Sequence, residues 1–275
     1  MAEAGIACGK ATRTLPPRSP MSSDRIAPTA RVHPDAHLAP DVQVGEFVFI
    51  GEKVRVGAGC VIGHHAVLHD GTRIGAGVRI DDHAVLGKRP MRAARSATTS
   101  AAELPPPSVG DDSLIGTGAV VYRGCTIGAR VLVADLATIR ERVTVGDETI
   151  VGRGVAIEND TSVGARCKLE TNAYLTAYST VEDDVFVAPG VLTSNDDYIG
   201  RTEARKAAFA GPTIRRGARL GVGAVVLPGR EVEAEAVVGA GAVLTGTAPG
   251  ARVSVGVPAR DVRAVAPEQL RENGG

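Results

Sequence analysis

The sequence predicts an all-β fold, a parallel β-helix in which each coil has three flat sides. An aliphatic side chain recurs at every sixth position, from Ile26 to Leu86, from Val109 to Val187 and from Ile214 to Leu244. A period of six fits neither a 3.6-residue helix nor a period-2 strand. It fits a tube with six residues on each side and eighteen in each coil. The 31 aliphatic positions therefore predict about ten coils.

The residues between the aliphatic positions predict a narrow interior. Aromatic residues make up only 3% of the chain, there is no Trp, and there are 34 Gly. The position after the aliphatic residue is often Gly, as at Gly45 and Gly57, and we expect Gly at corners that need a positive φ or a tight bend. Four residues after the aliphatic one, the side chain is usually small or β-branched, as at Ala66 and Val78. Three cysteines occupy this inward position and are predicted to be core residues: Cys60, Cys125 and Cys167.

Interruptions of the period define the expected organisation of the chain. Residues 1–25, rich in Ala, Pro, Ser and Arg, are expected to be a disordered extension without a secretory signal. The β-helix is predicted over 26–262, with insertions at 88–108 and 194–212. Residues 263–275 are expected to form a short tail with one helical turn at 267–270. Long insertions in a compact fold are usually functional or disordered, so we expect at least one of them to border a binding cleft.

Composition excludes several classes of function. Lys and Arg number 31 and Asp and Glu also number 31, so neither nucleic acid nor an anionic membrane surface is an expected partner. No run of eighteen apolar residues predicts a membrane span. No Cys-x-x-Cys motif exists, and the use of cysteine is typical of a reducing cytoplasm.

Polar residues gather at positions that an eighteen-residue coil would align along one edge. Arg140 and Glu141 are followed one coil later by Glu158 and Asn159, and the second insertion opens at the same edge with the pair Asn195 and Asp196. A ladder of solvated ion pairs, each contributing little, is the alternative interpretation. Because the column coincides with an insertion, we favour a substrate site. A nearby polar stretch adds three further candidates for substrate binding: Glu170, Asn172 and Tyr178.

The tandem hexads resemble those of the left-handed β-helix acyltransferases over roughly residues 26–262. The segment 181–190, VEDDVFVAPG, followed by Thr193-Ser194-Asn195-Asp196, is similar to nucleotide-sugar N-acetyltransferases. Residues 217–260 resemble their acetyl-CoA-binding end, with Val257 where the family has Asn. The early hexads resemble UDP-N-acetylglucosamine O-acyltransferases, but Asn159 and Tyr178 stand where those enzymes have His. The left-handed coiling is itself implied by this resemblance.

This resemblance implies an acetyl-CoA-dependent N-acetyltransferase that acts on the amino group of a nucleotide-linked amino sugar. The amine would attack the thioester directly, with Glu158 or Glu141 orienting it or accepting its proton. Asn159, Asn172 and Asn195 would form hydrogen bonds with substrate or oxyanion, and Asp196 would hold a sugar hydroxyl. An amine that is already neutral needs less help from a base than a hydroxyl does.

The resemblance also implies a binding site for CoA and an assembly. The pantetheine arm would lie along Gly221 to Ala242, and Arg216 and Arg260 would contact the phosphates of CoA. The full set of candidate cofactor-binding residues is Gly221, Ala224, Gly239, Ala242, Arg216 and Arg260. The family forms homotrimers with active sites in the clefts between subunits, and Asn172 is a candidate for facing a neighbouring subunit.

Other functions stay open at this point. The chain could act on another small amine, or use a longer acyl chain. It could instead be a non-catalytic or metal-binding trimer, as in the γ-class carbonic anhydrases, a branch of this fold that binds zinc through three His. Here His33 and His69 lie two coils apart, but Ile74 occupies the place of a third ligand, so no metal is expected. No Gly-rich domain precedes the repeats, which argues against a nucleotidyltransferase.

Overall fold

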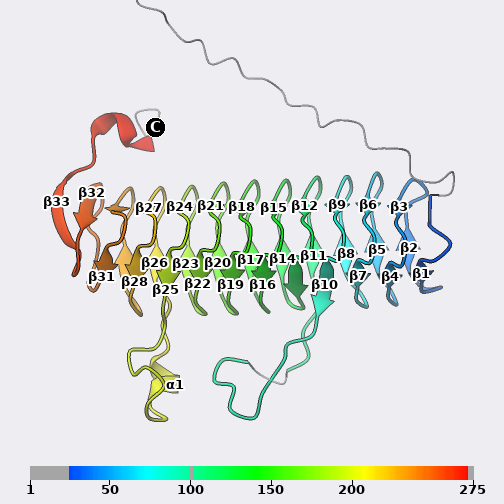
Figure 1. Cartoon of the computed structure of the whole chain (residues 1–275), viewed down its shortest axis with the longest axis horizontal. Coiled ribbons are helices and arrows are strands. Elements are labelled where there is room, and N and C mark those ends of the chain that lie inside the picture. The colour runs from blue at the N-terminus through cyan, green and yellow to red at the C-terminus, as the bar shows by residue number, and fades with distance from the viewer. Residues whose placement is uncertain (1–24, 100–101, 272–275) are drawn as a thin grey trace, which may run out of the picture.

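The computed structural model describes residues 25–99 and 102–271, and it shows a left-handed parallel β-helix (Figure 1). Three parallel sheets form the three sides of a straight tube, and consecutive strands along the chain lie on successive sides. We call these sides face 1, face 2 and face 3. The predicted all-β solenoid with two inserted loops and a short tail is therefore confirmed. The expected disordered extension at 1–25 falls almost entirely outside the described residues.

The strands are short, mostly two residues each, because every side of a coil turns after six residues. Face 1 consists of β1 (Arg31–Val32), β4 (Phe49–Ile50), β7 (Val67–Leu68), β10 (Val85–Lys88), β13 (Val120–Tyr122), β16 (Thr138–Ile139), β19 (Ala156–Ile157), β22 (Tyr174–Leu175), β25 (Leu192–Thr193), β28 (Val225–Val226) and β31 (Val243–Leu244).

Face 2 consists of β2 (His37–Leu38), β5 (Arg55–Val56), β8 (Arg73–Ile74), β11 (Ser108–Val109), β14 (Thr126–Ile127), β17 (Thr144–Val145), β20 (Ser162–Val163), β23 (Thr180–Val181), β26 (Thr213–Ile214) and β29 (Glu231–Val232). Face 3 consists of β3 (Gln43–Val44), β6 (Val61–Ile62), β9 (Arg79–Ile80), β12 (Leu114–Ile115), β15 (Leu132–Val133), β18 (Ile150–Val151), β21 (Lys168–Leu169), β24 (Phe186–Val187), β27 (Arg219–Leu220), β30 (Val237–Val238), β32 (Arg252–Val255) and β33 (Arg260–Ala264). The helices are α1 (Arg205–Ala208) and the 3₁₀ helix η1 (Pro267–Gln269).

The aliphatic position of each hexad points into the tube. Ile50, Ile62 and Leu68 are fully buried, and the same holds for their counterparts along the whole solenoid. The strand register places each aliphatic residue directly over the one eighteen positions earlier, as Ile139 pairs with Ile157. The three cysteines lie in this core as predicted, unpaired and buried. Burial of aliphatic surface along the tube therefore drives the fold.

The role predicted for glycine needs correction at the corners. Apart from Gly87, the Gly directly after the aliphatic residue does not have a positive φ; a Cβ at Gly57 would instead lie 2.6 Å from the carbonyl carbon of Gly75 in the next coil. The positive φ falls two residues later, as at Gly59, and at many corners a non-glycine residue adopts it. Close approach of successive coils is thus the main reason for the glycine at the first position.

The two ends of the tube differ from the prediction in detail. The number of coils is slightly larger than the ten expected, because β32 continues face 3 beyond the last predicted aliphatic position, Leu244. β33 then folds back antiparallel onto β32 and crosses the expected boundary at 262. This return covers the hydrogen-bonding edge of the last coil, which would otherwise be open to pairing with another chain. The predicted helical turn is present as η1.

Candidate active site

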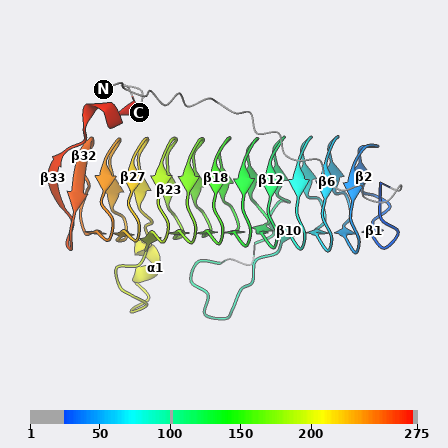
Figure 2. The same cartoon turned by 45° about the horizontal axis from the view of Figure 1, so that its top comes forward.

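Both insertions leave the tube at the same edge, where the chain passes from face 1 to face 2; we call it edge 1–2. Loop 1 (residues 89–107) follows β10, and loop 2 (residues 194–212) follows β25 and contains α1. Figures 1 and 2 show the two loops projecting from one side of the tube, with a row of coils between them. That stretch of edge 1–2 carries the predicted polar column.

Arg140 is the centre of a network on this stretch. Its guanidinium donates to both carboxylate oxygens of Glu141, at 2.9 and 3.3 Å, and to Glu158 Oε2 at 3.2 Å. The same group lies 5.0 Å from the ring centroid of Tyr122, which is itself buried. One cation thus faces two carboxylates and an aromatic face.

The two carboxylates differ in accessibility. The side chain of Glu141 is fully buried, whereas that of Glu158 is 24% exposed. Burial raises the pKa of Glu158; Arg140 opposes this effect and the negative charge of Glu141 adds to it, so that the net pKa lies above the ordinary value. Glu158 is therefore the carboxylate that combines access for a ligand with an affinity for a proton.

Asn159 is buried next to this pair with its amide held in one orientation. Its Nδ2 donates to Asp160 Oδ2 at 2.6 Å and to the carbonyl oxygen of Thr98 at 3.3 Å. Its Oδ1 is buried and has no partner among the described residues. Because both amide hydrogens are used, Asn159 offers a free acceptor and no free donor.

Asp160 owes its position to a bidentate ion pair with Arg142, at 2.5 and 2.7 Å. Burial raises the pKa of Asp160, but the hydrogen bonds from Arg142 and Asn159 outweigh burial and hold the pKa below its ordinary value. Both residues have positive φ, 59° for Arg142 and 58° for Asp160. This conformation is unfavourable for residues other than glycine, and the ion pair between successive coils helps to offset that cost.

Loop 1 lies over the network. Thr99, which is nearly buried, accepts a hydrogen bond from Arg140 through its hydroxyl at 3.2 Å, and Thr98 contacts Asn159 as described. The loop therefore contacts Arg140 and the amide nitrogen of Asn159 and leaves Glu158 partly open.

Loop 2 borders the other end of the same stretch. The ring of Tyr178 stacks on Phe209 of loop 2, with centroids 6.4 Å apart, and Asn195 Nδ2 donates to the carbonyl oxygen of Ala177 at 3.4 Å. Asp196 accepts hydrogen bonds from the backbone of Tyr198 and Gly200 and from Arg205. Its oxygens are thus engaged within the loop, where they fix the loop's shape.

Other predicted site residues lie elsewhere. Glu170 and Asn172, together with Gly221 and Gly239, lie at the edge between faces 3 and 1, which we call edge 3–1. The side chains of Ala224 and Ala242 are fully buried in the core, so that only their backbone can reach a ligand. Arg216 lies at the edge between faces 2 and 3, edge 2–3, next to Asp184. Arg260 is exposed on β33.

Several residues of the network were not among the predicted site residues: Thr98, Thr99, Tyr122, Arg142 and Asp160. Spacing alone could have identified the Arg142–Asp160 pair, because the two residues are eighteen positions apart and Tyr178 follows by the same interval. Thr98 and Thr99 had no such signal, since a loop has no register with the coils.

Within residues 25–99 and 102–271, no three His, Cys, Asp or Glu side chains are arranged to hold a metal ion. The same residues contain no helix long and apolar enough to cross a membrane.

Comparison with known proteins identifies the repeat. Residues 47–82 match the family model of the bacterial transferase hexapeptide (six repeats). Residues 106–134, 142–177 and 213–246 match the hexapeptide repeat of succinyl-transferase. The matched segments therefore carry hexapeptide repeats of the kind found in bacterial transferases. This agrees with the family resemblance and the enzyme class expected from the sequence. No curated protein sequence matches the chain significantly.

Solved structures support the same fold. UDP-N-acetylglucosamine acyltransferase from Arabidopsis is 22% identical, with a TM-score of 0.61, over 90% of this chain and 77% of its own. The enzyme of the same name from Francisella novicida is 20% identical, with a TM-score of 0.51, over 90% of this chain and 73% of its own. UDP-N-acetylglucosamine O-acyltransferase from Moraxella catarrhalis is 16% identical, with a TM-score of 0.50, over 92% of this chain and 79% of its own. At these identities the likeness concerns the fold.

Proposed function

We propose that this hexapeptide-repeat protein is an acetyl-CoA-dependent N-acetyltransferase that acts on the amino group of a nucleotide-linked amino sugar. The observation that carries the proposal is the pairing of Glu158, a partly open carboxylate with a raised pKa, with the free acceptor oxygen of Asn159. Such groups suit a ligand that brings N–H donors and gives up a proton. The nucleotide sugar as acceptor is supported by the resemblance of residues 181–196 to enzymes that use one.

In the proposed reaction the amine nitrogen attacks the thioester carbonyl and forms a tetrahedral intermediate. Glu158 accepts the proton that the nitrogen loses, the C–S bond breaks, and the proton passes to the departing thiolate of CoA. Arg140 keeps Glu158 oriented. The same guanidinium also pairs with the buried carboxylate of Glu141. Asn159 is fully buried, so a ligand would reach its Oδ1 only after a rearrangement of the groups around it.

An amine suits this edge better than a hydroxyl as the acceptor. A hydroxyl nucleophile needs a base throughout the attack, and the described coils between the loops carry no His for that task. The groups that face the ligand here are oxygens of carboxylates and an amide, and Arg140 is already neutralised by two carboxylates. The edge therefore favours a donor-bearing group such as an amine.

The acyl donor would bind at edge 3–1, where Gly221 and Gly239 lie, with Arg260 near the end of the tube. Acetyl-CoA is the donor that we propose; a longer acyl chain or another small amine is the runner-up. The unpaired cysteines fit the cytoplasm as the place of action.

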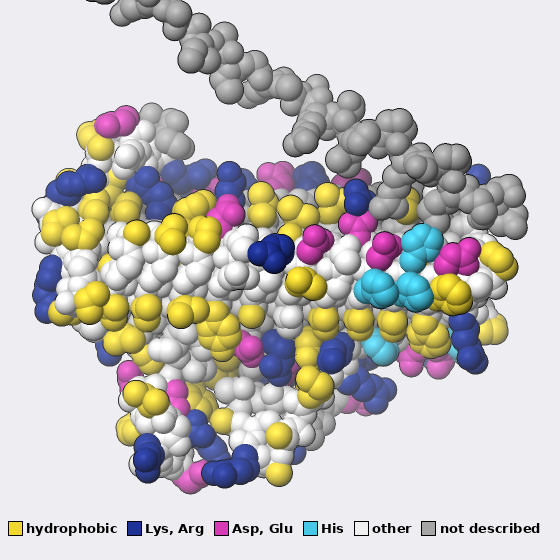
Figure 3. All heavy atoms as spheres, in the orientation of Figure 1, with side chains coloured by type: hydrophobic (Ala, Val, Ile, Leu, Met, Phe, Trp, Pro, Cys, Tyr) yellow, Lys and Arg dark blue, Asp and Glu magenta, His cyan; other side chains and the backbone are white. Residues whose placement is uncertain are grey.

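A homotrimer is part of the proposal, and the outward side chains support it. Face 2 presents polar residues to solvent, whereas face 1 presents a nearly continuous apolar stripe. The stripe consists of Phe49, Val67, Val85, Val120, Ala156, Tyr174, Leu192, Val225 and Val243. Figure 3 shows rows of apolar side chains running along the tube. Face 1 lies between edge 1–2 and edge 3–1, so that subunits packed on it would bring the acceptor and donor regions of neighbouring copies together.

The direct test is a thiol-release assay with acetyl-CoA and a panel of amines: UDP- and dTDP-linked amino sugars, free amino sugars and small amino acids. We expect CoA release with a nucleotide-linked amino sugar and little with the corresponding nucleotide sugar that has a hydroxyl in place of the amine. Turnover of the hydroxyl compound alone would contradict the proposal. Replacing acetyl-CoA by longer acyl-CoAs in the same assay decides the acyl length.

The trimer is tested by light scattering coupled to size-exclusion chromatography. Leu192→Arg on face 1 should yield monomers, because it places a charge in the apolar contact. Thr144→Arg on face 2 is the matched control and should leave the assembly unchanged. A monomeric wild type would contradict this part of the proposal.

A further inference from the structure

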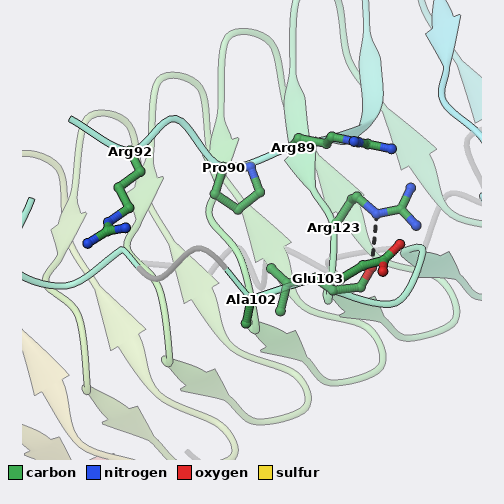
Figure 4. A pocket seen from close by; sticks show the side chains of 7 residues that line it. Arg89, Pro90, Arg92, Ala102, Glu103 and Arg123 are labelled. Atoms are coloured by element: carbon green, nitrogen blue, oxygen red, sulfur yellow. Dashed lines mark hydrogen bonds between the residues drawn. The ribbon is translucent and has the colours of Figure 1, made fainter. Parts of the chain in front are cut away.

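Between loop 1 and the tube lies an open pocket of about 500 Å³, lined by Arg89, Pro90, Arg92, Ala102, Glu103, Leu104 and Arg123. Figure 4 shows Arg89 and Arg123 extending in the same direction, with Glu103 beside Arg123 and Arg92 beyond Pro90. The volume falls in the range of small-molecule sites. Neither of the sites proposed above includes these residues.

The pocket holds more positive than negative charge. Three arginines and one carboxylate, that of Glu103, line it. Among the described residues, neither Arg89 nor Arg92 has an ion-pair or hydrogen-bond partner for its side chain. Elsewhere on the tube most arginines at the edges pair with Asp or Glu, as Arg130 does with Glu148. The two arginines of loop 1 thus remain available for an anion.

Arg123 is held in place without being neutralised. Its Nε donates to the carbonyl oxygen of Leu104 at 2.9 Å, and its Nη1 donates to that of Asp70 at 3.1 Å. Carbonyl oxygens fix the plane of the guanidinium but carry no net charge. The group therefore keeps its positive charge in a defined orientation, which suits binding of a phosphate through the planar fork.

The pocket adjoins the network around Glu158. Arg123, Glu141 and Asn159 occupy equivalent positions in successive coils, so that the backbone of Arg123 lies two coils, about 10 Å, from that of Asn159, while its guanidinium extends toward the earlier coil that holds Asp70. Tyr122 lies between the two regions, with Lys88 Nζ 5.8 Å and Arg140 Cζ 5.0 Å from its ring centroid. The diphosphate and the sugar ring together, rather than the ring alone, would span the distance between this pocket and Glu158.

We propose that Arg89, Arg92 and Arg123 form a phosphate subsite that binds the phosphoanhydride of the nucleotide-linked acceptor. This inference rests on the proposed function for the identity of the ligand, but not for the presence of an anion site. The subsite would place the amine at Glu158 and would discriminate phosphorylated acceptors from free amino sugars.

Calorimetric titration with inorganic pyrophosphate tests the subsite on the full chain, independently of activity. We expect binding to the wild type, weakened about tenfold or more in Arg89→Ala and in Arg92→Ala, with the affinity falling as salt is raised. Arg153→Ala is the matched control, since Arg153 is exposed on edge 3–1 outside the pocket, and should bind as the wild type does. Absence of binding at millimolar pyrophosphate, or equal losses in Arg153→Ala, would overturn the proposal. Arg123→Ala is a third variant for the same titration. If it does not fold, Arg123→Lys, which keeps the positive charge, takes its place.

Steady-state kinetics identify the source of the phosphate, because CoA also carries a diphosphate. If the acceptor binds here, Arg89→Ala raises the KM for the nucleotide-linked amine about tenfold and leaves that for acetyl-CoA unchanged. A rise confined to the KM for acetyl-CoA would overturn the assignment to the acceptor. Retained pyrophosphate binding without any acetyl transfer would leave the subsite in place and remove the proposed function. Acetyl transfer without pyrophosphate binding would support the proposed function and overturn the phosphate subsite.

Discussion

Two edges of the tube carry ladders of arginine and carboxylate, and they differ in what surrounds them. On edge 2–3, Arg130 pairs with Glu148 at 2.8 Å, and the side chains are 54% and 48% exposed. On edge 1–2, Arg140 pairs with Glu141 and Glu158, and the exposures fall to 20%, 0% and 24%. In both ladders the inter-coil partners, Arg130 with Glu148 and Arg140 with Glu158, lie eighteen residues apart, so the repeat itself produces both.

The difference arises from the loops. Edge 2–3 has no insertion among the described residues, and its Arg130–Glu148 pair is solvated and contributes little, although Asp184 further along this edge is buried and pairs with Arg166 and Arg216. On edge 1–2, Thr99 and Thr98 of loop 1 accept hydrogen bonds from Arg140 and Asn159, which are less exposed than Arg130. Burial there raises the pKa of Glu158 against the opposing effect of Arg140, and Asn159 Oδ1 is left without a hydrogen-bond partner. Perturbed groups of this kind are typical of functional sites.

The largest effect is expected for catalysis. Glu158→Gln should lower kcat by roughly 10²- to 10⁴-fold, because it removes the group that accepts the proton of the amine. Glu148→Gln on edge 2–3 is the matched control and should leave kcat unchanged. The measurement is acetyl transfer at saturating substrate. Unchanged turnover of Glu158→Gln would remove Glu158 from the mechanism.

The next effect concerns stability. Arg140→Ala should lower the free energy of unfolding by about 3 kcal/mol, because it leaves Glu141 buried without a positive partner. Arg130→Ala, whose pair is solvated, should show no change beyond experimental error in chemical denaturation. Equal losses in the two variants would mean that the edges do not differ in the way that their burial indicates.

A smaller effect is expected for Asp160→Asn. The change removes the negative charge and one of the two acceptor oxygens that bind Arg142 and Asn159, and should lower kcat/KM between about ten- and a hundredfold, with Glu158 intact. The ion pair of Asp160 also contributes stability, which is present above the ordinary carboxylate pKa and is lost as pH falls through the lowered pKa of the folded state. The stability difference from wild type should therefore shrink in strong acid; a constant difference would argue against the pair as its cause.

The smallest expected effect concerns the dependence of kcat/KM on pH. Glu158 must be ionised to accept a proton, so kcat/KM should fall as pH decreases through its pKa, which burial raises above the ordinary range for glutamate. The residual activity of Glu158→Gln should lack this limb. A limb that persists in Glu158→Gln reports protonation of the acceptor amine instead.

The six-residue period predicted the tube well, because every coil places aliphatic side chains at the same inward positions. Val133 and Val151 had to face inward once the six-residue period was recognised, and the eighteen-residue coil placed Glu158 beside Arg140. The corners were less predictable, since Arg142 and Asp160 occupy positive-φ positions where glycine was expected. Their ion pair between coils explains why the expectation based on local preference was wrong there.

The contacts of the loops and of the C-terminal tail could not be predicted from the period. Nothing in the period places Thr99 on Arg140, because a loop has no fixed register against the coils. The return of β33 and the contact of Arg271 with Asp184 join residues far apart in sequence, without a repeat to align them.

The sequence by itself determined the tube, its aliphatic core and the edge on which the charged residues gather, because a fixed period converts spacing directly into position. Only the tertiary structure decided which charges are buried, which acceptor is left free and where the unpaired arginines of loop 1 lie. Those properties depend on what covers a residue, and a loop settles that by contacts that no repeat encodes.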